Sequence, residues 1–409
     1  MARTEERQRA ARRATGQARP VRPVGPVRAT GAIGANAART RRTRRPARAN
    51  VGYVLFLGLV LLINLVGLVM VLSASSVQAQ HTYGNPWYVF ERQILWVVVG
   101  AAALVAFVNI DYRKLRRLSI PLMFVVVGLL LAVLVPGIGL SVNGSSRWLG
   151  FGSWRVQPSE LAKLALVLFG ADLLTRRADR MHDLWSTFGP VMLAMGGLAL
   201  LIMLQPDMGT TVIVLAIAFA LVFVAGTPLR AIFKAVGTMS LLGFLAGMLA
   251  PYRRDRLLTF LHPFRDAGNT GYQIIQSYVG LGSGGLFGRG LGNGIEKWGF
   301  LPNPYTDFIF AVIGEETGLV GTVVVVLLFA GFAVLGVRAA VRAPDRFGTL
   351  LATGITAWIV VQALLNMGAV IGILPVTGVP LPFVSFGGSS LVITLAGAGI
   401  LANVARNGR

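Results

Sequence analysis

Cysteine is absent from the 409 residues, so the chain cannot form a disulfide bond, a thiolate zinc site or a cysteine nucleophile. Histidine is scarce as well: His81, His182 and His262 lie far apart without the spacing of metal ligands. Charged residues make up only 13% of the chain and hydrophobic residues 55%, a balance that few soluble domains have. Long apolar runs take the place of charge, and they indicate a protein whose solvent is a lipid bilayer.

Apolar runs of about the length that a spanning helix needs recur from one end of the chain to the other. Several of them are rich in glycine, as membrane helices often are. The pattern predicts an all-α polytopic membrane protein with about ten transmembrane helices. The predicted spans are 51–73, 93–109, 119–140, 159–174, 189–204, 209–226, 235–251, 308–337, 348–373 and 389–404.

Basic residues are concentrated at the N-terminus. Residues 1–49 contain 14 Arg against Glu5 and Glu6, so they contribute +12 of the formal net charge of +22. This segment is rich in Arg, Ala, Pro and Gly, which predicts a disordered cytoplasmic tail that is attracted to anionic lipid, and a nucleic-acid partner is not expected. Residues 50–405 would form the transmembrane domain, and 406–409 a short cytoplasmic end.

The remaining Lys and Arg residues predict the orientation of the spans. With both termini in the cytoplasm, the inside loops carry most of the positive charge, as the positive-inside rule requires. These basic positions are 111–117, 175–180, Arg230, Lys234, 338–346, Arg406 and Arg409. The long segment 252–307, between the seventh and eighth spans, then lies outside, and its apolar residues predict short amphipathic helices.

Three acids mark the end of this outer segment and the helix after it. Asp307 stands at the start of the eighth span. One interpretation is structural: Thr306 and Asp307 could cap the helix that begins there. Glu315 and Glu316 follow about two helical turns deeper. Because a charge within a span is costly, we expect at least one of these glutamates to face the bundle interior and pair with a cation or a backbone group.

Two further outer segments contain ionisable residues. Arg147 precedes a helix that starts near Pro158 and carries Glu160 and Lys163 on one face. The two cations could bind a phosphate group, or Lys163 could simply neutralise Glu160. In QPDMG, residues 205–209, Asp207 could cap the second of two helices.

Two glycine-containing segments need separate interpretations. The run GLGSGGLFGRGLGN, residues 280–293, has no preceding strand and no P-loop Lys-Ser/Thr, so nucleotide binding is rejected and Arg289 is expected to reach an acidic headgroup. The Pro- and Gly-rich PVTGVPLPFVSFGGSS, residues 375–390, separates the last two spans. Irregular backbone at membrane depth lines a cavity or is buried in protein, so this segment serves either a site or a structural turn.

Together these segments resemble one family. NGSSRW with QPSELAKLA, QPDMGT, GYQIIQS with GRGLGN, TDFIFAVIGEETG and NMGAVIGILPVTGVPLPFVSFGGSS are similar to motifs of the SEDS proteins of shape, elongation, division and sporulation. The resemblance covers about residues 51–404, and MVLSASS and RQILW are most similar to its cell-division branch. NPYTDF departs from the family pattern at Tyr305, which affects only the fine contacts of the loop because Thr306 and Asp307 are kept.

The resemblance implies a peptidoglycan glycosyltransferase that polymerises lipid II at the outer face of the bacterial cytoplasmic membrane. Its partners would be lipid II, a class B penicillin-binding transpeptidase and other division proteins. Inverting a sugar linked to pyrophosphate requires one carboxylate to take the proton of the attacking hydroxyl, and Asp307 is predicted to be that general base. The predicted substrate contacts are Arg147, Glu160, Lys163, Arg289, Lys297, Ser385 and Gly387.

Two questions stay open at this level. Cations must stabilise the leaving pyrophosphate, and the sequence does not decide whether a divalent ion, Mg²⁺ or Mn²⁺, assists them. No DxD sequence is present, in agreement with a lipid-linked donor. The alternative functions are an ion-coupled lipid II flippase and a non-catalytic division scaffold; ATP-driven flipping is excluded because the chain has no Walker A motif.

Overall fold

The computed structural model describes residues 51–408, apart from 143–144, 152–153, 179–183, 231–232, 235–236, 239–258 and 269–270. The predicted tail 1–49 and nearly all of the predicted seventh span lie outside these residues. The described chain is a helical, multi-span membrane protein. Its long helices are α2 (Val51–Tyr83), α3 (Tyr88–Asn109), α4 (Ser119–Leu134), α5 (Pro158–Arg176), α6 (Leu184–Leu204), α7 (Met208–Val224), α11 (Ile309–Val341), α12 (Arg346–Val370) and α13 (Gly388–Asn407).

Among the described residues, six helical stretches are long and apolar enough to cross a membrane: α2, α3, the stretch Tyr112–Leu134 that includes α4, α11, α12 and α13. The apolar parts of α6 and α7 are shorter, Gly189–Leu204 and Met208–Val224. Helix α5 is more polar, because it carries Glu160, Lys163 and Asp172, and all three side chains are buried in the protein. Burial in protein is where ionisable groups of a membrane helix are tolerated.

Local signals account for the helix ends. The Asp207 side chain accepts a hydrogen bond from the Thr210 backbone N–H at 3.1 Å, so the predicted cap of α7 is confirmed. Asp345 caps α12 in the same way, from Gly348 N–H at 2.8 Å. The span predicted over 119–140 was too long: α4 ends at Leu134 because Pro136 disfavours helical backbone at the residue before it.

The segment after α4, which was predicted to lie outside, contains a small antiparallel sheet that the all-α prediction missed. Strands β1 (Leu140–Val142), β2 (Ser145–Phe151) and β3 (Trp154–Val156) pair in the order β1-β2-β3. The register places Leu140 opposite Trp148 and Leu149 opposite Val156. Strands of three to seven residues leave no apolar run of helix length, so hydropathy alone does not reveal them.

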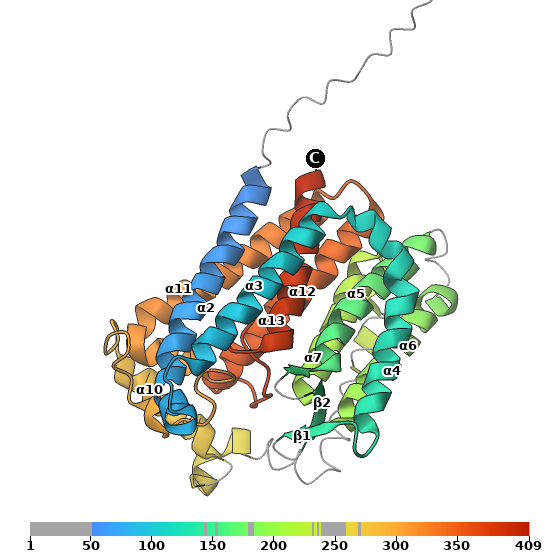
Figure 1. Cartoon of the computed structure of the whole chain (residues 1–409). Coiled ribbons are helices and arrows are strands. Elements are labelled where there is room, and N and C mark those ends of the chain that lie inside the picture. Colours follow the sequence, from blue (N-terminus) through green and yellow to red (C-terminus); the bar gives the residue numbers. More distant parts are fainter. Residues whose placement is uncertain are drawn as a thin grey trace, which may run out of the picture. The chain divides into compact units, whose positions relative to one another are not determined.

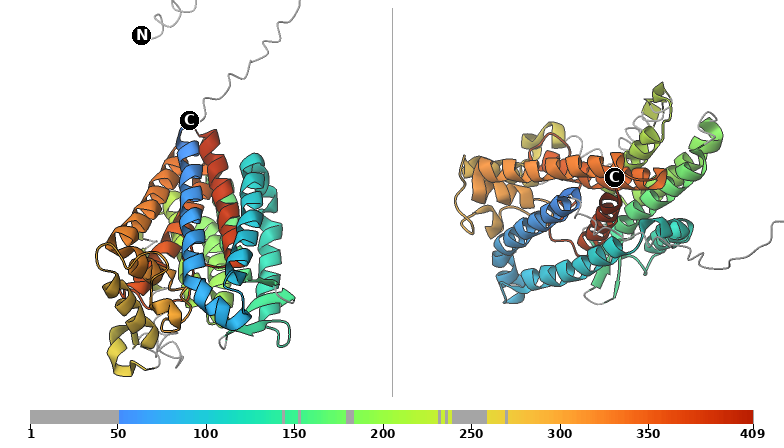
Figure 2. Two further views of the ribbon diagram at one scale, coloured as in Figure 1. Left: turned by 60° about the vertical axis from the view of Figure 1, so that its left-hand side comes forward. Right: turned by 90° about the horizontal axis from the view of Figure 1, so that it is seen from above.

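The helices pack around α13, which contacts α3 most extensively and also touches α2, α11 and α12 (Figure 1). The start of α2 and the end of α13 lie at one end of the bundle, whereas the sheet lies at the opposite end, as the left view of Figure 2 also shows. The long segment before α11 contains the short helix α10 (Tyr272–Gly284), so the prediction of a helix in this segment is confirmed. Helix α10 packs against α11. The predicted outer segments therefore gather at one end of the molecule.

Candidate active site

Asp307 lies at the end of the bundle that carries the sheet, immediately before α11. Its side chain is half-buried, and its backbone carbonyl accepts a hydrogen bond from Asn366 Nδ2 of α12 at 2.7 Å. Phe308 occupies the N-cap position of α11, so the alternative in which Thr306 or Asp307 is the N-cap residue is not the geometry found. Asp307 is thus held by α12, immediately before its own helix α11 begins.

The irregular segment 371–387 packs directly against the residues before Asp307. The Phe386 backbone N–H donates to the Tyr305 carbonyl at 2.9 Å, and Ser385 Oγ donates to the Thr306 carbonyl at 2.6 Å. Ser385 is buried and its hydroxyl also accepts from Leu381 N–H at 2.8 Å. In this geometry Ser385 holds the loop together, while Gly387 is the N-cap residue of α13.

Two amides of α12, one helical turn apart, fix the other side of this segment. Gln362 Nε2 donates to the Pro380 carbonyl at 2.9 Å, and Asn366 Nδ2 donates to the Val379 carbonyl at 2.8 Å. Because these carbonyls belong to irregular backbone, the amides supply partners that a helix would otherwise provide. A small pocket remains between the loop, α12 and Asp307. It is lined by Asp307, Phe308, Asn366, Ala369, Val370 and residues 376–379.

Lys163 and Glu160 form a buried ion pair at the start of α5. Lys163 Nζ lies 2.8 Å from the Glu160 carboxylate and donates to Gln362 Oε1 at 2.7 Å. It also lies 5.1 Å from the ring centroid of Trp358. The interpretation in which Lys163 neutralises Glu160 describes this geometry, and Gln362 links the pair to the loop beside Asp307. Substrate contacts of either residue stay a prediction.

Arg147 of β2 joins the sheet to the turn before α7. Its Nε donates to the Gln205 carbonyl at 3.0 Å, its Nη2 donates to the Pro206 carbonyl, and its Nη1 lies 3.9 Å from Asp207 Oδ1. The Arg147 side chain is 15% exposed. Most of its donors therefore hold the turn, and a role in binding pyrophosphate stays a prediction.

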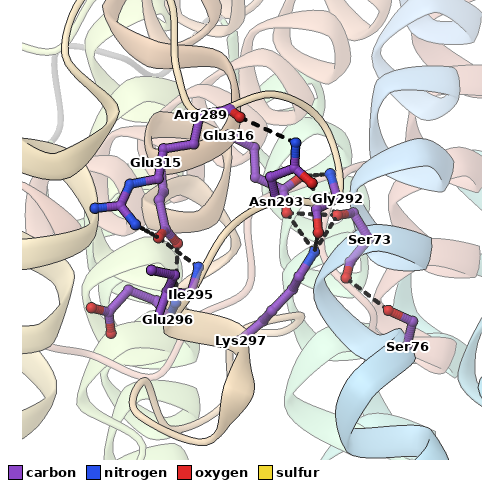
Figure 3. Close-up of polar contacts among 10 residues, drawn as sticks. All are labelled: Ser73, Ser76, Arg289, Gly292, Asn293, Ile295, Glu296, Lys297, Glu315 and Glu316. Atoms are coloured by element: carbon purple, nitrogen blue, oxygen red, sulfur yellow. Dashed lines mark hydrogen bonds and ion pairs between the residues drawn. The ribbon is translucent and has the colours of Figure 1, made fainter.

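Glu315 and Glu316 fasten the loop after α10 to α11 (Figure 3). Glu316 lies 2.8 Å from Lys297 Nζ and accepts from Ser73 Oγ of α2 at 2.7 Å. Glu315 accepts from the backbone N–H groups of Ile295 at 2.7 Å and Glu296 at 3.2 Å. The prediction that at least one glutamate pairs with a cation or a backbone group is confirmed for both.

The same contacts locate the two other predicted cations. The Lys297 side chain is 3% exposed, because Nζ is enclosed by Glu316, Ser73 and the Gly292 carbonyl. Arg289 is 37% exposed and its Nη1 lies 4.0 Å from Glu315 Oε1. Lys297 thus holds the loop in this structure. Contacts of Lys297 and of Arg289 with substrate stay predictions.

Glu296, in the 3₁₀ turn Glu296–Trp298, is the acid of this region whose environment is least favourable for a charge. Burial, reinforced by the neighbouring Glu315 carboxylate and offset in part by Arg289, raises the pKa of Glu296 to about 7. Its Oε2 atom is buried and has no hydrogen-bond partner within the described part of the chain. Glu296 is therefore half-protonated near neutral pH.

A metal site was left open by the sequence. Among the residues that the structure describes, no group of three or more Asp, Glu or His side chains is arranged to hold a metal ion.

Sequence reasoning missed Gln362, Asn366, Ser73 and Thr377, all of which lie at these contacts. The signal that could have found the first two is an amide pair at i and i+4 within an apolar span, where polar side chains are functional by default. Ser73 lies within a quoted motif but offers no charge. Its contact with Glu316 joins residues 243 positions apart, which no local pattern reveals.

Comparison with known proteins identifies the family of this chain. Residues 53–409 match the family described as cell cycle protein, which comprises FtsW, RodA and SpoVE. The chain belongs to this SEDS family. Among SEDS relatives, the probable peptidoglycan glycosyltransferase FtsW of Geobacter metallireducens is 43% identical over 339 residues, which cover 83% of this chain and 90% of that protein. Stage V sporulation protein E of Bacillus subtilis is 41% identical over 344 residues, which cover 84% and 94%.

Solved structures resemble the SEDS chain as well. One solved chain comes from a study of the "structural coordination of polymerization and crosslinking by a peptidoglycan synthase complex". It has a TM-score of 0.72 at 30% identity, and the match covers 88% of this chain and 98% of that chain. The rod shape determining protein RodA of Thermus thermophilus has a TM-score of 0.63 at 30% identity, covering 86% and 95%. The multi-span helical fold is thus shared with solved SEDS proteins.

Proposed function

We propose that this peptidoglycan glycosyltransferase of the SEDS family polymerises lipid II with Asp307 as the general base. The observation that carries the proposal is the setting of Asp307. It is a half-buried carboxylate beside a pocket, with its backbone held by Asn366 and the preceding residues held by the loop 371–387. A fixed base next to a space for the reacting group is what proton transfer requires.

In the proposed reaction, the 4-hydroxyl of the acceptor GlcNAc attacks the anomeric carbon of the donor sugar. The hydroxyl proton passes to Asp307, the new C–O bond forms, and the bond from the anomeric carbon to the pyrophosphate oxygen breaks with inversion. Lipid pyrophosphate leaves with the electron pair, and Asp307 later returns its proton to water. A single carboxylate suffices because pyrophosphate needs cations rather than a proton donor.

The exposure of the four predicted cationic side chains indicates which of them can face the leaving group. Arg147 and Arg289 have exposed side-chain area, whereas Lys163 and Lys297 are enclosed by their ion pairs. We therefore assign the donor pyrophosphate to Arg147 and Arg289. Lys163 reaches substrate only if its pair with Glu160 opens, and in the closed state it stabilises the loop through Gln362.

The membrane arrangement is proposed as ten spans with both termini cytoplasmic and the Asp307 end outside, in the cytoplasmic membrane. The seventh span would supply the missing crossing between α7 and α10. A role in cell division is proposed because of the similarity to proteins named FtsW. A class B penicillin-binding transpeptidase is the proposed partner, since the study of one solved relative concerns a complex that polymerises and crosslinks.

Incubation of the purified protein with lipid II in detergent tests the function, because only a polymerase lengthens glycan chains without a membrane to cross. We expect the wild type to produce glycan chains. Asp307→Asn keeps the side-chain volume but cannot take a proton, so the rate should fall by about 10²–10⁴-fold at unchanged thermal stability. Asp111→Asn, at the other end of the bundle, is the control and should polymerise normally.

Three results would contradict the proposal. A wild-type protein that moves lipid II across vesicles but never lengthens glycan chains would be a flippase, and one that does neither would be a scaffold. An Asp307→Asn enzyme with a near-normal rate would show that another group is the base.

A further inference from the structure

Two residues that line the pocket beside Asp307 each have a buried polar atom without a partner in the described part of the chain. Asn366 Oδ1 and Thr377 Oγ1 are buried and have no hydrogen-bond partner among the described residues. The Asn366 and Thr377 side chains belong to residues only 2% and 8% exposed. Buried polar atoms are nearly always bonded in folded proteins, so two such atoms in one pocket with a carboxylate indicate a place that a polar ligand completes.

The walls of the pocket are held in place. Both contacts of the Asn366 amide nitrogen, to the carbonyls of Asp307 and Val379, are made, so Oδ1 is left as a pure acceptor. Thr377 packs against the start of α7, where a Cβ on Gly209 would lie 2.9 Å from Thr377 Cβ. Gly378 presents bare backbone to the acid, since a Cβ there would lie 3.7 Å from Asp307 Oδ2.

Size and charge restrict the ligand. The cavity volume is about 10 Å³, which is what one water-sized group needs. Among the described residues, Asp307 is the only charged one in the lining, so an anion such as pyrophosphate would be repelled. A hydroxyl group fits both limits, because it is small and neutral and can donate and accept hydrogen bonds.

We propose that Thr377 and Asn366 bind the acceptor hydroxyl that Asp307 deprotonates and so determine the specificity of the acceptor subsite. This inference rests on the proposed polymerase function. The Thr377 O–H donates to the hydroxyl oxygen, where negative charge develops as the proton leaves. The hydroxyl proton faces the Asp307 carboxylate, with Asn366 Oδ1 as the second acceptor that restricts its orientation.

Substitutions at Thr377 separate hydrogen bonding from packing. Thr377→Val replaces the hydroxyl by a methyl group of similar size, whereas Thr377→Ser keeps the hydroxyl. We expect kcat/KM for lipid II polymerisation to fall about ten-fold in Thr377→Val and to stay near wild type in Thr377→Ser. Thr377→Ala gives a second loss of the hydroxyl if the valine variant folds poorly. Thr353→Val, a helix-internal threonine of α12, is the matched control and should be unaffected.

A lipid II analogue that lacks the GlcNAc 4-hydroxyl makes the assignment specific. Wild-type enzyme should bind this analogue more weakly than lipid II, as measured by inhibition, and the difference should shrink in Thr377→Val. Equal losses in Thr377→Val and Thr377→Ser, or wild-type kinetics in both hydroxyl-free variants, would overturn the inference. Failure of the wild type to polymerise would instead overturn the proposed function, so the two outcomes are distinguishable.

Discussion

Glu296 shows how one residue can make stability depend on pH. With a pKa of about 7 in the folded state against an ordinary value of 4.5, the folded protein keeps a proton that the unfolded chain releases between these values. The free energy of unfolding therefore falls as pH rises from about 4.5 to 7. Above pH 7 the side chain is charged in both the folded and the unfolded state, so the free energy of unfolding stays at the lower value. The penalty above pH 7 is on the order of 3 kcal/mol.

Glu296→Gln imitates the protonated side chain and removes this penalty. We expect the variant to have a higher melting temperature than the wild type at pH 8 and a similar one at pH 5, measured on purified protein in detergent. Glu91→Gln, at an exposed position of α3, is the control and should change little at either pH. A stability gain that is the same at both pH values would mean that the charge of Glu296 is not its cause.

The pairing of single residues was only partly predictable. The Glu160–Lys163 pair could be foreseen because i and i+3 positions share a helix face. The Lys297–Glu316 and Arg147–Asp207 contacts could not, because they join a loop or a strand to a helix through tertiary packing. As a result, cations that look available in the sequence are largely used by the fold.

At the scale of elements, the apolar runs predicted the long helices, because six helical stretches among the described residues are long and apolar enough to cross a membrane. The break in α11 was missed. Gly318 has φ 70° and ψ −164° inside the helix, and the glycine-rich loop supplies the lost backbone partners. Arg289 and Gly290 N–H donate to the carbonyls of Glu315 and Glu316 at 3.0 Å. Without nucleotide binding, the sequence indicated no role for these glycines. Their role is visible only where the loop packs against α11.

Gly288 tests this docking, because its backbone touches the break in α11. A Cβ on Gly288 would lie 2.2 Å from the Glu316 carbonyl oxygen, whereas one on Gly292 would meet nothing within 4 Å. Both glycines have a positive φ, 79° and 84°. Alanine at either position would therefore have the same left-handed backbone strain, about 1–2 kcal/mol. Gly288→Ala should therefore lower the melting temperature and the polymerisation rate more than Gly292→Ala. Equal effects would show that φ alone matters.

At the scale of the whole molecule, the segments predicted to lie outside gather at one end of the bundle, and this is the end at which we propose the chemistry. The turn that contains Lys114 and the connection that contains Arg342 join helices at the opposite end, near the start of α2 and the end of α13 (Figure 1). Lipid II polymerisation outside the membrane requires that the Asp307 end face the outside. The basic residues near Lys114 and Arg342 favour that orientation, since inside loops carry the excess of Lys and Arg.

Cysteine labelling can decide the orientation, since the natural chain has no cysteine to replace first. Ala267→Cys, at an exposed position before α10, should react with a membrane-impermeant maleimide in intact cells. Lys114→Cys and Arg342→Cys, also exposed, should react only after the membrane is permeabilised. Each variant must retain polymerase activity, so that labelling reports the native arrangement. Labelling of Ala267→Cys only in permeabilised cells would place Asp307 in the cytoplasm, where a base for polymerising lipid II on the outer face could not act.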